Sequence, residues 1–380
     1  MKTLVFVFFD AGGGHRSAAT AVSAILQRRP RPWDIALLNL QELLDPLDPF
    51  HRLAGVRLQD IYNRMLASGR TLGAGALLPP LHGLLRLYES RVVRQLERHW
   101  TKLGPAAVVS FVPHFNRALA RSLRPAGTPL VTVLTDLADY PPHFWMEKES
   151  QYLVCGSDRA MEQARALGHP AHRTLRASGM ILKPQFYDLP PLERGAERRK
   201  LGLDPDLPTG LVMFGGFGPP VMKKIAQALQ HAPLELQLIL ICGRNDRLAA
   251  ELRNLPGRMP MYVEGFTPNI SYYMRLADFF VGKTGPGSIS EAVAMHLPVV
   301  VERNVRTLPQ ERYNAQWIVE NGVGIVLPHF GAIVDAVKTL LEPGALASYR
   351  DRCSRIRNRA VFEVADFLEQ VATANGNAPA

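Results

Sequence analysis

Short apolar runs recur along the whole chain, and stretches with the residue spacing of amphipathic helices separate them. The runs cover residues 4–9, 35–40, 106–111, 130–134 and 152–155 in the first half, and 210–214, 237–242, 261–264, 279–282, 298–302 and 324–327 in the second. Short runs that are apolar at successive positions are typical of strands buried on both faces of a parallel sheet. The alternation therefore predicts an α/β protein whose parallel sheets are covered by helices.

The alternation is interrupted between residues 179 and 210, where prolines and charged residues accumulate around a short helical stretch at 197–201. A chain of 380 residues is long enough for two domains, each with its own core. We expect a helix over 346–372 and a flexible tail after it. The predicted organisation is an N-terminal domain over 1–183, a linker over 184–191, a C-terminal domain over 192–360, and a helix end with tail over 361–380.

A glycine-rich turn follows the first apolar run. Gly12, Gly13 and Gly14 separate that run from a helical pattern at 17–26, and His15 comes directly after them. Glycines permit positive φ and close approach of a ligand, and the N–H groups of the helix start favour a negative group. The turn is at the carboxyl edge of the sheet, where open α/β sheets bind ligands, so His15 is a candidate proton acceptor. Alternatively, the turn is only tight and His15 caps the helix. The spacing is not that of a nucleotide P-loop.

The positive charge is concentrated in one part of the chain. The formal net charge is +10, and residues 51–124 contain twelve Arg and Lys against three Asp and Glu. Leucines alternate with arginines in this stretch, as in basic amphipathic segments that lie on anionic membranes. Nucleic acid is the competing partner, but no nucleic-acid-binding motif is present. A solvated helix face is the third interpretation.

The cysteine content and the N-terminal sequence indicate the cellular compartment that we expect for this protein. Cys155, Cys242 and Cys353 lie far apart, so neither a disulfide framework nor a zinc site is indicated, and a reducing cytoplasm fits best. The N-terminal sequence lacks a signal-peptide pattern, and no apolar run is long enough to span a bilayer. We expect a soluble or peripheral protein.

Two further glycine turns follow apolar runs in the second half. Gly215, Gly216 and Gly218 precede a helix that starts near Val221, and the segment 285–288 leads into a helix expected to carry Glu291 on its first turn. Helix-start amides suit a diphosphate, and a carboxylate can accept both ribose hydroxyls. This pattern predicts a sugar-nucleotide site, although Glu291 is also explained by ordinary helix-end electrostatics.

Several segments together resemble known proteins. These are "DAGGGHRSAA" at 10–19, "TDLADYPPHFW" at 135–145, "ICGRND" at 241–246, "GFTPNI" at 265–270, "KTGPGSISEA" at 283–292 and "LPQERYN" at 308–314. In this order they resemble the family 28 glycosyltransferases, most closely the monogalactosyldiacylglycerol synthases and bacterial diacylglycerol glucosyltransferases. The resemblance implies the GT-B fold, two Rossmann-like domains whose parallel sheets face a central cleft. It also implies inverting transfer of galactose or glucose from a UDP-sugar to diacylglycerol, without a metal or other cofactor.

The resemblance also implies roles for individual residues of the donor site. Gly265 and Phe266 border the uracil, Glu291 holds the ribose, and Gly287 with Ser288 meets the diphosphate. Gln310, Glu311 and Asn314 match a segment that holds the donor hexose. Gly215, Gly216 and Gly218 match a glycine loop of the family, from which the sequence departs at Phe217 and Pro219.

On the acceptor side, His15 is the expected base, and Asp136 is either the alternative base, the group that orients His15, or a buried structural carboxylate. His143 lies seven residues after Asp136, farther than in the related proteins. Its role in the acceptor site, which also includes the glycine turn, therefore stays open.

The expected partners are a UDP-sugar, a diacylglycerol-type lipid and an anionic membrane surface, without nucleic acid, at the inner face of the cell membrane. The alternatives are a peptidoglycan-type N-acetylglucosaminyltransferase, a UDP-sugar 2-epimerase and, outside the enzymes, a basic nucleic-acid-binding module.

Overall fold

The computed structural model describes residues 2–10, 13–30, 33–47, 78–141, 143–305 and 307–374. Gly12, residues 51–77 of the basic stretch and the tail after residue 374 are outside the described residues, and the predictions made for them are therefore not tested here.

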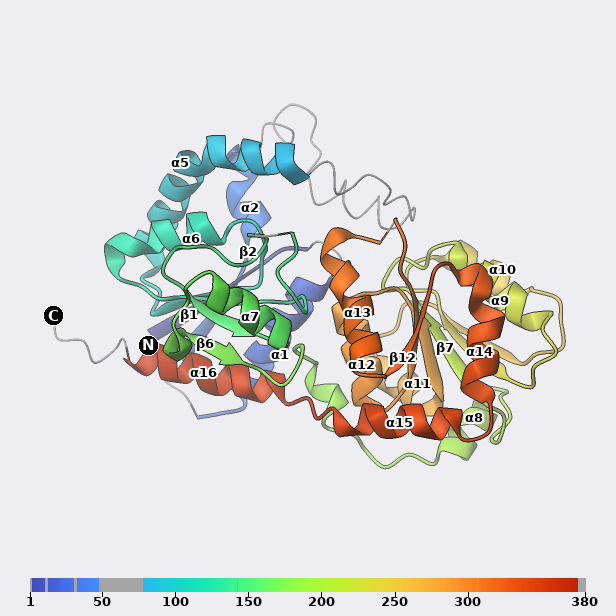
Figure 1. Ribbon diagram of the computed structural model, residues 1–380. Coiled ribbons are helices and arrows are strands. Elements are labelled where there is room, and N and C mark those ends of the chain that lie inside the picture. The colour runs from blue at the N-terminus through green and yellow to red at the C-terminus, as the bar shows by residue number, and fades with distance from the viewer. Residues whose placement is uncertain are drawn as a thin grey trace. The chain divides into compact units, whose positions relative to one another are not determined.

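The chain forms two compact units (Figure 1). Unit 1 contains the described residues up to Pro184 and the chain from Asn358 onward, and unit 2 contains Gln185–Arg357. The return to unit 1 corrects one sequence prediction. The single helix expected over 346–372 is two helices, α15 (Ala345–Arg355) in unit 2 and α16 (Ala360–Ala374) in unit 1. Helix α16 packs beside α1 (Gly14–Gln27), where Arg29 forms an ion pair of 2.5 Å with Asp366.

Unit 1 contains a six-stranded parallel sheet in the order β2-β1-β3-β4-β5-β6. Its strands are β1 (Lys2–Phe8), β2 (Trp33–Asn39), β3 (Ala107–Ser110), β4 (Leu130–Val133), β5 (Tyr152–Cys155) and β6 (Thr174–Arg176). The five runs predicted in the first half are all strands. Strand β6 was not predicted, because it has only three residues, none of them buried, at the edge of the sheet.

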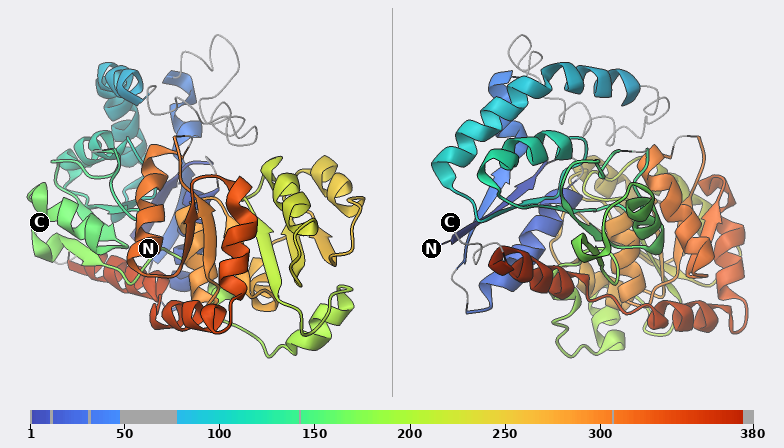
Figure 2. Two further views of the ribbon diagram at one scale, coloured as in Figure 1. Left: turned by 45° about the vertical axis from the view of Figure 1, so that its right-hand side comes forward. Right: turned by 60° about the vertical axis from the view of Figure 1, so that its left-hand side comes forward.

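Helices of unit 1 cover the lower and upper faces of this sheet (Figures 1 and 2). Besides α1 and α16 they are α2 (Leu40–Leu44), α5 (Leu78–Leu103), α6 (Asn116–Leu123) and α7 (Asp158–Ala166). Helix α5 buries Val92, Leu96 and Trp100 in a core with β1 and β3. Its leucine and arginine pattern therefore includes an apolar face that packs inside the protein. No helix among the described residues is both long and apolar enough to cross a bilayer.

Unit 2 repeats the plan with a parallel sheet in the order β12-β11-β10-β7-β8-β9. The strands are β7 (Thr209–Met213), β8 (Gln237–Ile241), β9 (Met261–Glu264), β10 (Phe279–Gly282), β11 (Val299–Glu302) and β12 (Gly324–Leu327). Each lies within a predicted run, except that β7 begins one residue before its run. The helices are α8 (Arg194–Lys200), α9 (Val221–Gln230), α10 (Asp246–Arg253), α11 (Ile270–Leu276), α12 (Pro286–Ala294), α13 (Arg312–Glu320), α14 (Ile333–Leu341) and α15.

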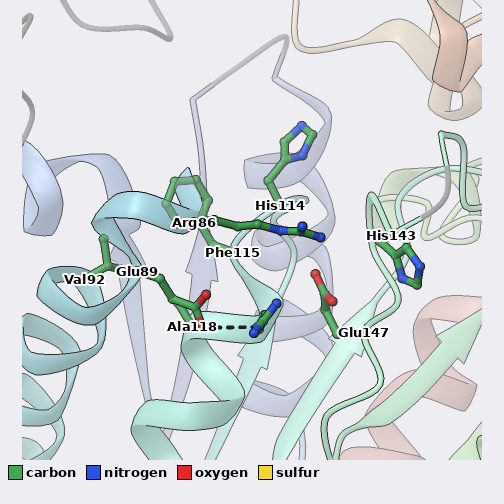
Figure 3. Close-up of a pocket in the computed structure, with 9 residues that line it drawn as sticks. Arg86, Glu89, Val92, His114, Phe115, Ala118, His143 and Glu147 are labelled. Atoms are coloured by element: carbon green, nitrogen blue, oxygen red, sulfur yellow. Dashed lines mark ion pairs between the residues drawn. The ribbon is translucent and has the colours of Figure 1, made fainter. Parts of the chain in front are cut away.

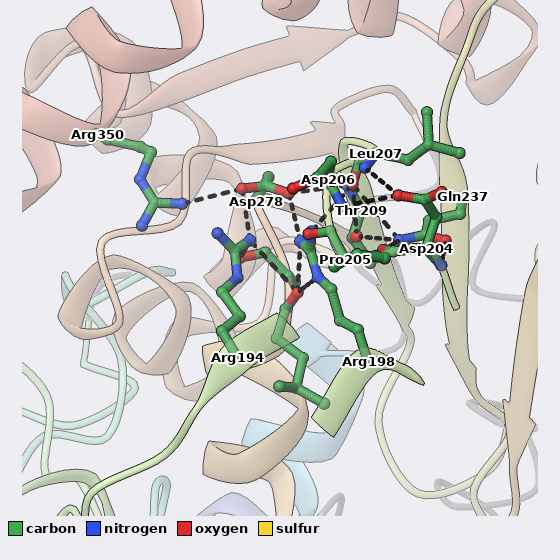
Figure 4. A network of polar contacts seen from close by, with 12 residues as sticks. Arg194, Arg198, Asp204, Pro205, Asp206, Leu207, Thr209, Gln237, Asp278 and Arg350 are labelled. Carbon is green, nitrogen blue, oxygen red and sulfur yellow. Dashed lines mark hydrogen bonds and ion pairs between the residues drawn. The ribbon is translucent and has the colours of Figure 1, made fainter. Parts of the chain in front are cut away.

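A buried ionic network fixes the amino ends of two central strands of unit 2 (Figure 4). Asp278, just before β10, forms ion pairs of 2.5 Å with Arg194 and 2.7 Å with Arg198, and it accepts a hydrogen bond of 2.9 Å from the N–H of Thr209. Burial opposes ionisation of Asp278, but the hydrogen bond and charge of Arg194, together with Arg198, hold its pKa below the usual value. This network joins α8 to β7 and β10 at the end of the sheet opposite the predicted ligand edge.

The strand orders place the glycine turns at equivalent points of the two sheets. The order changes direction between β1 and β3 in unit 1, and between β7 and β10 in unit 2. Open α/β sheets bind ligands beyond the carboxyl ends of the strands at such switch points. The turns at 13–14, 215–218 and 283–286 follow β1, β7 and β10 and lie at these positions.

Candidate functional site

His15 lies in the first turn of α1, directly after β1. Gly13 is the N-cap with a φ of 80°, a left-handed conformation that favours glycine, so the turn presents His15 at the carboxyl edge of the sheet. The imidazole Nδ1 is 3.1 Å from the hydroxyl of Thr135, which follows β4. Burial lowers the pKa of His15 to about 4, and a hydrogen bond involving the Phe111 backbone only partly opposes this shift. The imidazole is therefore neutral at neutral pH.

Asp136 is buried, and Trp145 links it to His15. The indole Nε1 of Trp145 donates a hydrogen bond of 2.9 Å to Oδ2 of Asp136. The ring centroids of Trp145 and His15 are 5.8 Å apart. The side chain that lies within hydrogen-bond distance of the His15 ring is that of Thr135, one residue before Asp136.

Asp139 organises the loop that carries Trp145 and His143. Its carboxylate accepts hydrogen bonds of 2.6 Å from the N–H of Trp145 and 3.1 Å from the N–H of His143. Burial raises the pKa of Asp139 to about 6, although these two backbone hydrogen bonds act in the opposite direction. The longer spacing between Asp136 and His143 thus makes room for Asp139, whose carboxylate binds two backbone N–H groups of the loop. Asp139 is a supporting residue that the sequence analysis did not select.

A pocket opens in unit 1 next to this loop (Figure 3). Side chains from α5, from the β3–α6 connection, from α6 and from the loop after β4 line it: Arg86, Glu89, Val92, His114, Phe115, Arg117, Ala118, His143 and Glu147. His143 is therefore a pocket residue, and the Nδ1 of its ring is 3.2 Å from the carbonyl of Met146.

In unit 2 the loop after β7 is braced against the loop after β8. The N–H of Arg244 donates a 2.9 Å hydrogen bond to the carbonyl of Gly216, and the Asn245 side chain donates one of 2.6 Å to the carbonyl of Gly218. Gly218 has a φ of 49°, and a Cβ at this position would collide with the carbonyl of Cys242. Glycine is required here because two backbone segments approach each other closely.

The loop after β9 contributes an exposed aromatic ring. Phe266 is 60% exposed, and the guanidinium of Arg244 lies 4.9 Å from its ring centroid. The neighbouring Gly265 donates its N–H to Glu264 at 2.9 Å. This arrangement offers a planar cationic and aromatic surface at the carboxyl edge of β8 and β9.

Helix α12 starts beside the end of β10. The hydroxyl of Ser288 donates a 3.2 Å hydrogen bond to the carbonyl of Gly285, the N-cap residue. The prediction that Glu291 lies in the first turn was wrong: the helix begins at Pro286, and its first turn contains no acidic residue, so Glu291 lies in the second turn.

Lys283 and Glu311 form an ion pair next to this helix start. The Lys283 ammonium is 2.7 Å from one carboxylate oxygen of Glu311, and the hydroxyl of Thr284 donates to the other at 3.2 Å. Asn314, fully buried, donates a 2.7 Å hydrogen bond to the carbonyl of Thr284. Both oxygens of Glu311 are thus engaged within the protein, whereas the Lys283 side chain is 39% exposed. Gln310 precedes Glu311 in a short 3₁₀ helix, Pro309–Glu311.

Comparison with known proteins identifies this arrangement. Residues 218–369 match the glycosyltransferase family 28 C-terminal domain. This chain is a glycosyltransferase of the GT-B fold. The match begins at Gly218, the last glycine of the braced loop, and covers the Lys283 segment and the Gln310–Asn314 segment.

Relatives and solved structures extend the similarity to both units of this glycosyltransferase. It is 27% identical to monogalactosyldiacylglycerol synthase of Spinacia oleracea over 97% of this chain and 72% of that protein. It is 28% identical to monogalactosyldiacylglycerol synthase 1 of Arabidopsis thaliana over 85% of this chain and 62% of that protein. The fold is similar to Acinetobacter baumannii MurG, with a TM-score of 0.64, 14% identity and coverage of 97% of this chain and 100% of that chain. It is also similar to S. aureus MnaA in complex with UDP, with a TM-score of 0.64, 13% identity and coverage of 100% and 99%.

The structure adds residues that the sequence analysis of this glycosyltransferase did not select. Thr135 and Trp145 contact His15 from a loop more than a hundred residues away. Lys283 and Arg244 stand in two of the segments quoted for the family resemblance, and a lysine or arginine within three residues of the end of a strand was the available signal.

Proposed function

We propose that this glycosyltransferase moves galactose or glucose from a UDP-sugar to diacylglycerol with inversion at the anomeric carbon. The observation that carries the proposal is the donor-rich turn system at the switch point of unit 2, in a chain related over nearly its whole length to a monogalactosyldiacylglycerol synthase. The UDP bound in the similar MnaA structure supports a uridine nucleotide as the donor part.

The donor is assigned to unit 2 as follows. Phe266 and Gly265 border the base, and Glu291 accepts the ribose hydroxyls. The helix start at Gly287 and Ser288 meets the diphosphate, because free N–H groups and the helix dipole favour negative charge. Lys283 adds a positive charge beside this helix start, and Gln310 faces the hexose. Glu311 positions Lys283, since both its oxygens are already engaged.

The base is assigned to His15. Inverting transfer requires removal of a proton from the acceptor hydroxyl, and a neutral imidazole can accept it. The lowered pKa of His15 keeps the imidazole neutral across the physiological range. Stabilisation of the leaving diphosphate by amides and Lys283 requires no metal ion, so we expect turnover to persist in the presence of a chelator.

The exposed face of α5 suits an anionic membrane. Arg91, Arg94 and Arg98 are exposed, opposite the face that buries Val92 and Leu96. Each cation near an anionic surface contributes on the order of 1 kcal/mol to attachment. We propose peripheral attachment at the inner face of the cell membrane, where diacylglycerol is available.

The deciding experiment is sugar transfer with the full chain. The purified protein is incubated with liposomes that contain diacylglycerol and with UDP-galactose, UDP-glucose or UDP-N-acetylglucosamine, each radiolabelled, and the lipid is extracted. Labelled lipid from galactose or glucose supports the proposal. Transfer from none of these donors would exclude the glycolipid function.

A further inference from the structure

We propose that the indole of Trp145 shields the imidazole of His15 from water, and that Asp139 is the residue that positions Trp145 there. Both Trp145 and Asp139 belong to the loop over residues 135–146, which follows β4. The shield is a property of the free protein, whereas its benefit to catalysis rests on the proposed function, in which His15 is the base.

Trp145 is buried, and each of its polar groups has a partner. Its indole N–H donates to Asp136 at 2.9 Å, and its backbone N–H donates to Asp139 at 2.6 Å. Its carbonyl accepts a hydrogen bond of 3.0 Å from the side chain of Asn116, at the start of α6. Buried polar networks whose members are all satisfied hold side chains in one arrangement. The indole of Trp145 is therefore fixed in its place beside His15.

Asp139 holds the loop with both of its carboxylate oxygens. Oδ1 accepts the hydrogen bond from the N–H of Trp145, and Oδ2 accepts one of 3.1 Å from the N–H of His143. His143 has a φ of 62°, a left-handed conformation that persists for a residue with a Cβ only where its surroundings enforce it. Gln163, on α7, bonds the N–H of Asp139 at 2.8 Å and its carbonyl at 2.9 Å. Asp139 thus fixes the path of the loop that carries Trp145.

The indole packs against the imidazole of His15 and leaves part of that residue accessible. The two ring centroids are 5.8 Å apart, and the ring planes are inclined by 51°. Trp145 is 1% exposed, whereas His15 is only partly buried. An apolar neighbour excludes water, and exclusion of water disfavours the charged imidazolium. Trp145 therefore contributes to the burial that lowers the pKa of His15 to about 4.

A change in the pKa of His15 has a direction that separates loss of the shield from loss of charge. Titratable groups near His15 or Asp139 lie on the turn after β1, on the 135–146 loop and its continuation, and on β5: Asp10, Arg16, Asp136, His143, Glu147 and Cys155. Asp139→Asn changes none of these groups. Removal of the negative charge of Asp139 would by itself lower the pKa of His15 or leave it unchanged, whereas entry of water beside a displaced Trp145 would raise it.

The test follows the ionisation of His15 in the full chain by NMR, with 13C-labelled histidine. The signal of His15 is the one that is missing from His15→Ala. In the parent this signal should keep its neutral position down to about pH 5, because the pKa is about 4. In Asp139→Asn the amide has one acceptor oxygen for two N–H groups, so Trp145 should move and the midpoint should rise toward 6.5, the ordinary value. UDP affinity should not change.

A control and a second variant accompany this measurement. Asp204→Asn is the matched control, because Asp204 also accepts two backbone N–H groups, from Asp206 at 2.8 Å and from Leu207 at 3.2 Å, but in unit 2. It should leave the midpoint of His15 at the parental value. Asn116→Ala changes no charge and releases the carbonyl of Trp145, so it should raise the midpoint as Asp139→Asn does.

The proposal is overturned if His15 of the parent titrates near 6.5, or if Asp139→Asn and Asn116→Ala, folded as judged by their melting curves, keep the parental midpoint. A rise in Asn116→Ala with a folded, unchanged Asp139→Asn would refute the role of Asp139. The titration needs no substrate. A shifted midpoint in a protein that transfers no sugar would support the shield and refute the glycolipid function, and transfer with the parental midpoint in both variants would do the reverse.

Discussion

The indole of Trp145 donates its N–H to the carboxylate of Asp136 at 2.9 Å. The same indole lies beside the imidazole of His15, and the two ring centroids are 5.8 Å apart. Asp136 is 7% exposed. We propose that it acts on His15 by holding Trp145 in place, while the hydroxyl of Thr135 lies 3.1 Å from the imidazole Nδ1. In the proposed mechanism His15 takes the proton, and Asp136 holds the indole of Trp145 beside it.

Replacement of His15 by alanine should abolish most turnover and leave donor binding intact. General-base catalysis contributes about 10²–10⁴-fold, so kcat should fall by that factor. UDP affinity, measured by calorimetry, should remain near the parental value, because the donor residues belong to unit 2. Thr135→Val is the companion variant and should cause a smaller loss. A folded His15→Ala protein that retains most of its turnover would transfer the base role to Asp136.

The pH profile should also report the burial of His15. Only the neutral imidazole accepts a proton, so the rate falls as pH falls through the pKa of His15. Because burial lowers that pKa to about 4, activity should persist well below pH 6.5, the ordinary midpoint for histidine. The measurement is kcat/KM between pH 4 and 8 with vesicles of zwitterionic lipid. A midpoint near 6.5 that disappears in His15→Ala would contradict the burial of the free imidazole.

Lys283 and Glu311 should have separable effects on the donor site. Lys283→Ala should weaken binding of UDP, because the ammonium beside the start of α12 is lost. Glu311→Gln retains the shape of the side chain but not its charge, so it should weaken UDP binding less and lower kcat through misplacement of Lys283. Calorimetry with UDP and steady-state kinetics distinguish the two variants. Equal effects on UDP affinity would mean that Glu311 itself contacts the nucleotide.

Asp278→Asn should destabilise unit 2 without changing the donor site. Loss of one member of a buried ion pair costs about 3–5 kcal/mol, and Arg198 is only 2% exposed. The free energy of unfolding, measured with urea at pH 7, should fall accordingly. The pKa of Asp278 is lowered in the folded state, so its contribution is present above the unfolded pKa and is lost as pH falls through the folded value. The variant should therefore lose less stability in acid than the parent does.

The exposed arginines of α5 should govern attachment to anionic vesicles. In a variant with Arg91, Arg94 and Arg98 all changed to glutamine, co-sedimentation with such vesicles should decrease, and added salt should reduce parental binding by screening. Arg86 is left intact because it lines the pocket. Replacement of three exposed arginines of unit 2, Arg244 excluded, is the charge-matched control. Equal sedimentation of the α5 variant and the parent would show that this face does not meet the membrane.

The sequence alone determined the strands, the two-domain α/β organisation and the general class of enzyme. Buried parallel strands are apolar at successive positions, so residues 210–214 or 279–282 are recognisable without any knowledge of their neighbours. Glycine turns directly after such strands are equally local, which is why His15 and Gly218 could be selected. Strand β6 was missed because an exposed three-residue edge strand has no such pattern.

Only the tertiary structure decided which side chains contact each other. Several contacts join segments that are far apart along the chain, such as those of His15 with Thr135 and of Lys283 with Glu311. Arg86 and Glu147, also far apart in sequence, line the same pocket. The break between α15 and α16 also depends on such contacts, because α16 packs on α1 of unit 1. Periodicity encodes which face of an element is buried, but the choice of partner depends on the order of strands in the sheet and on the path of the loops between them.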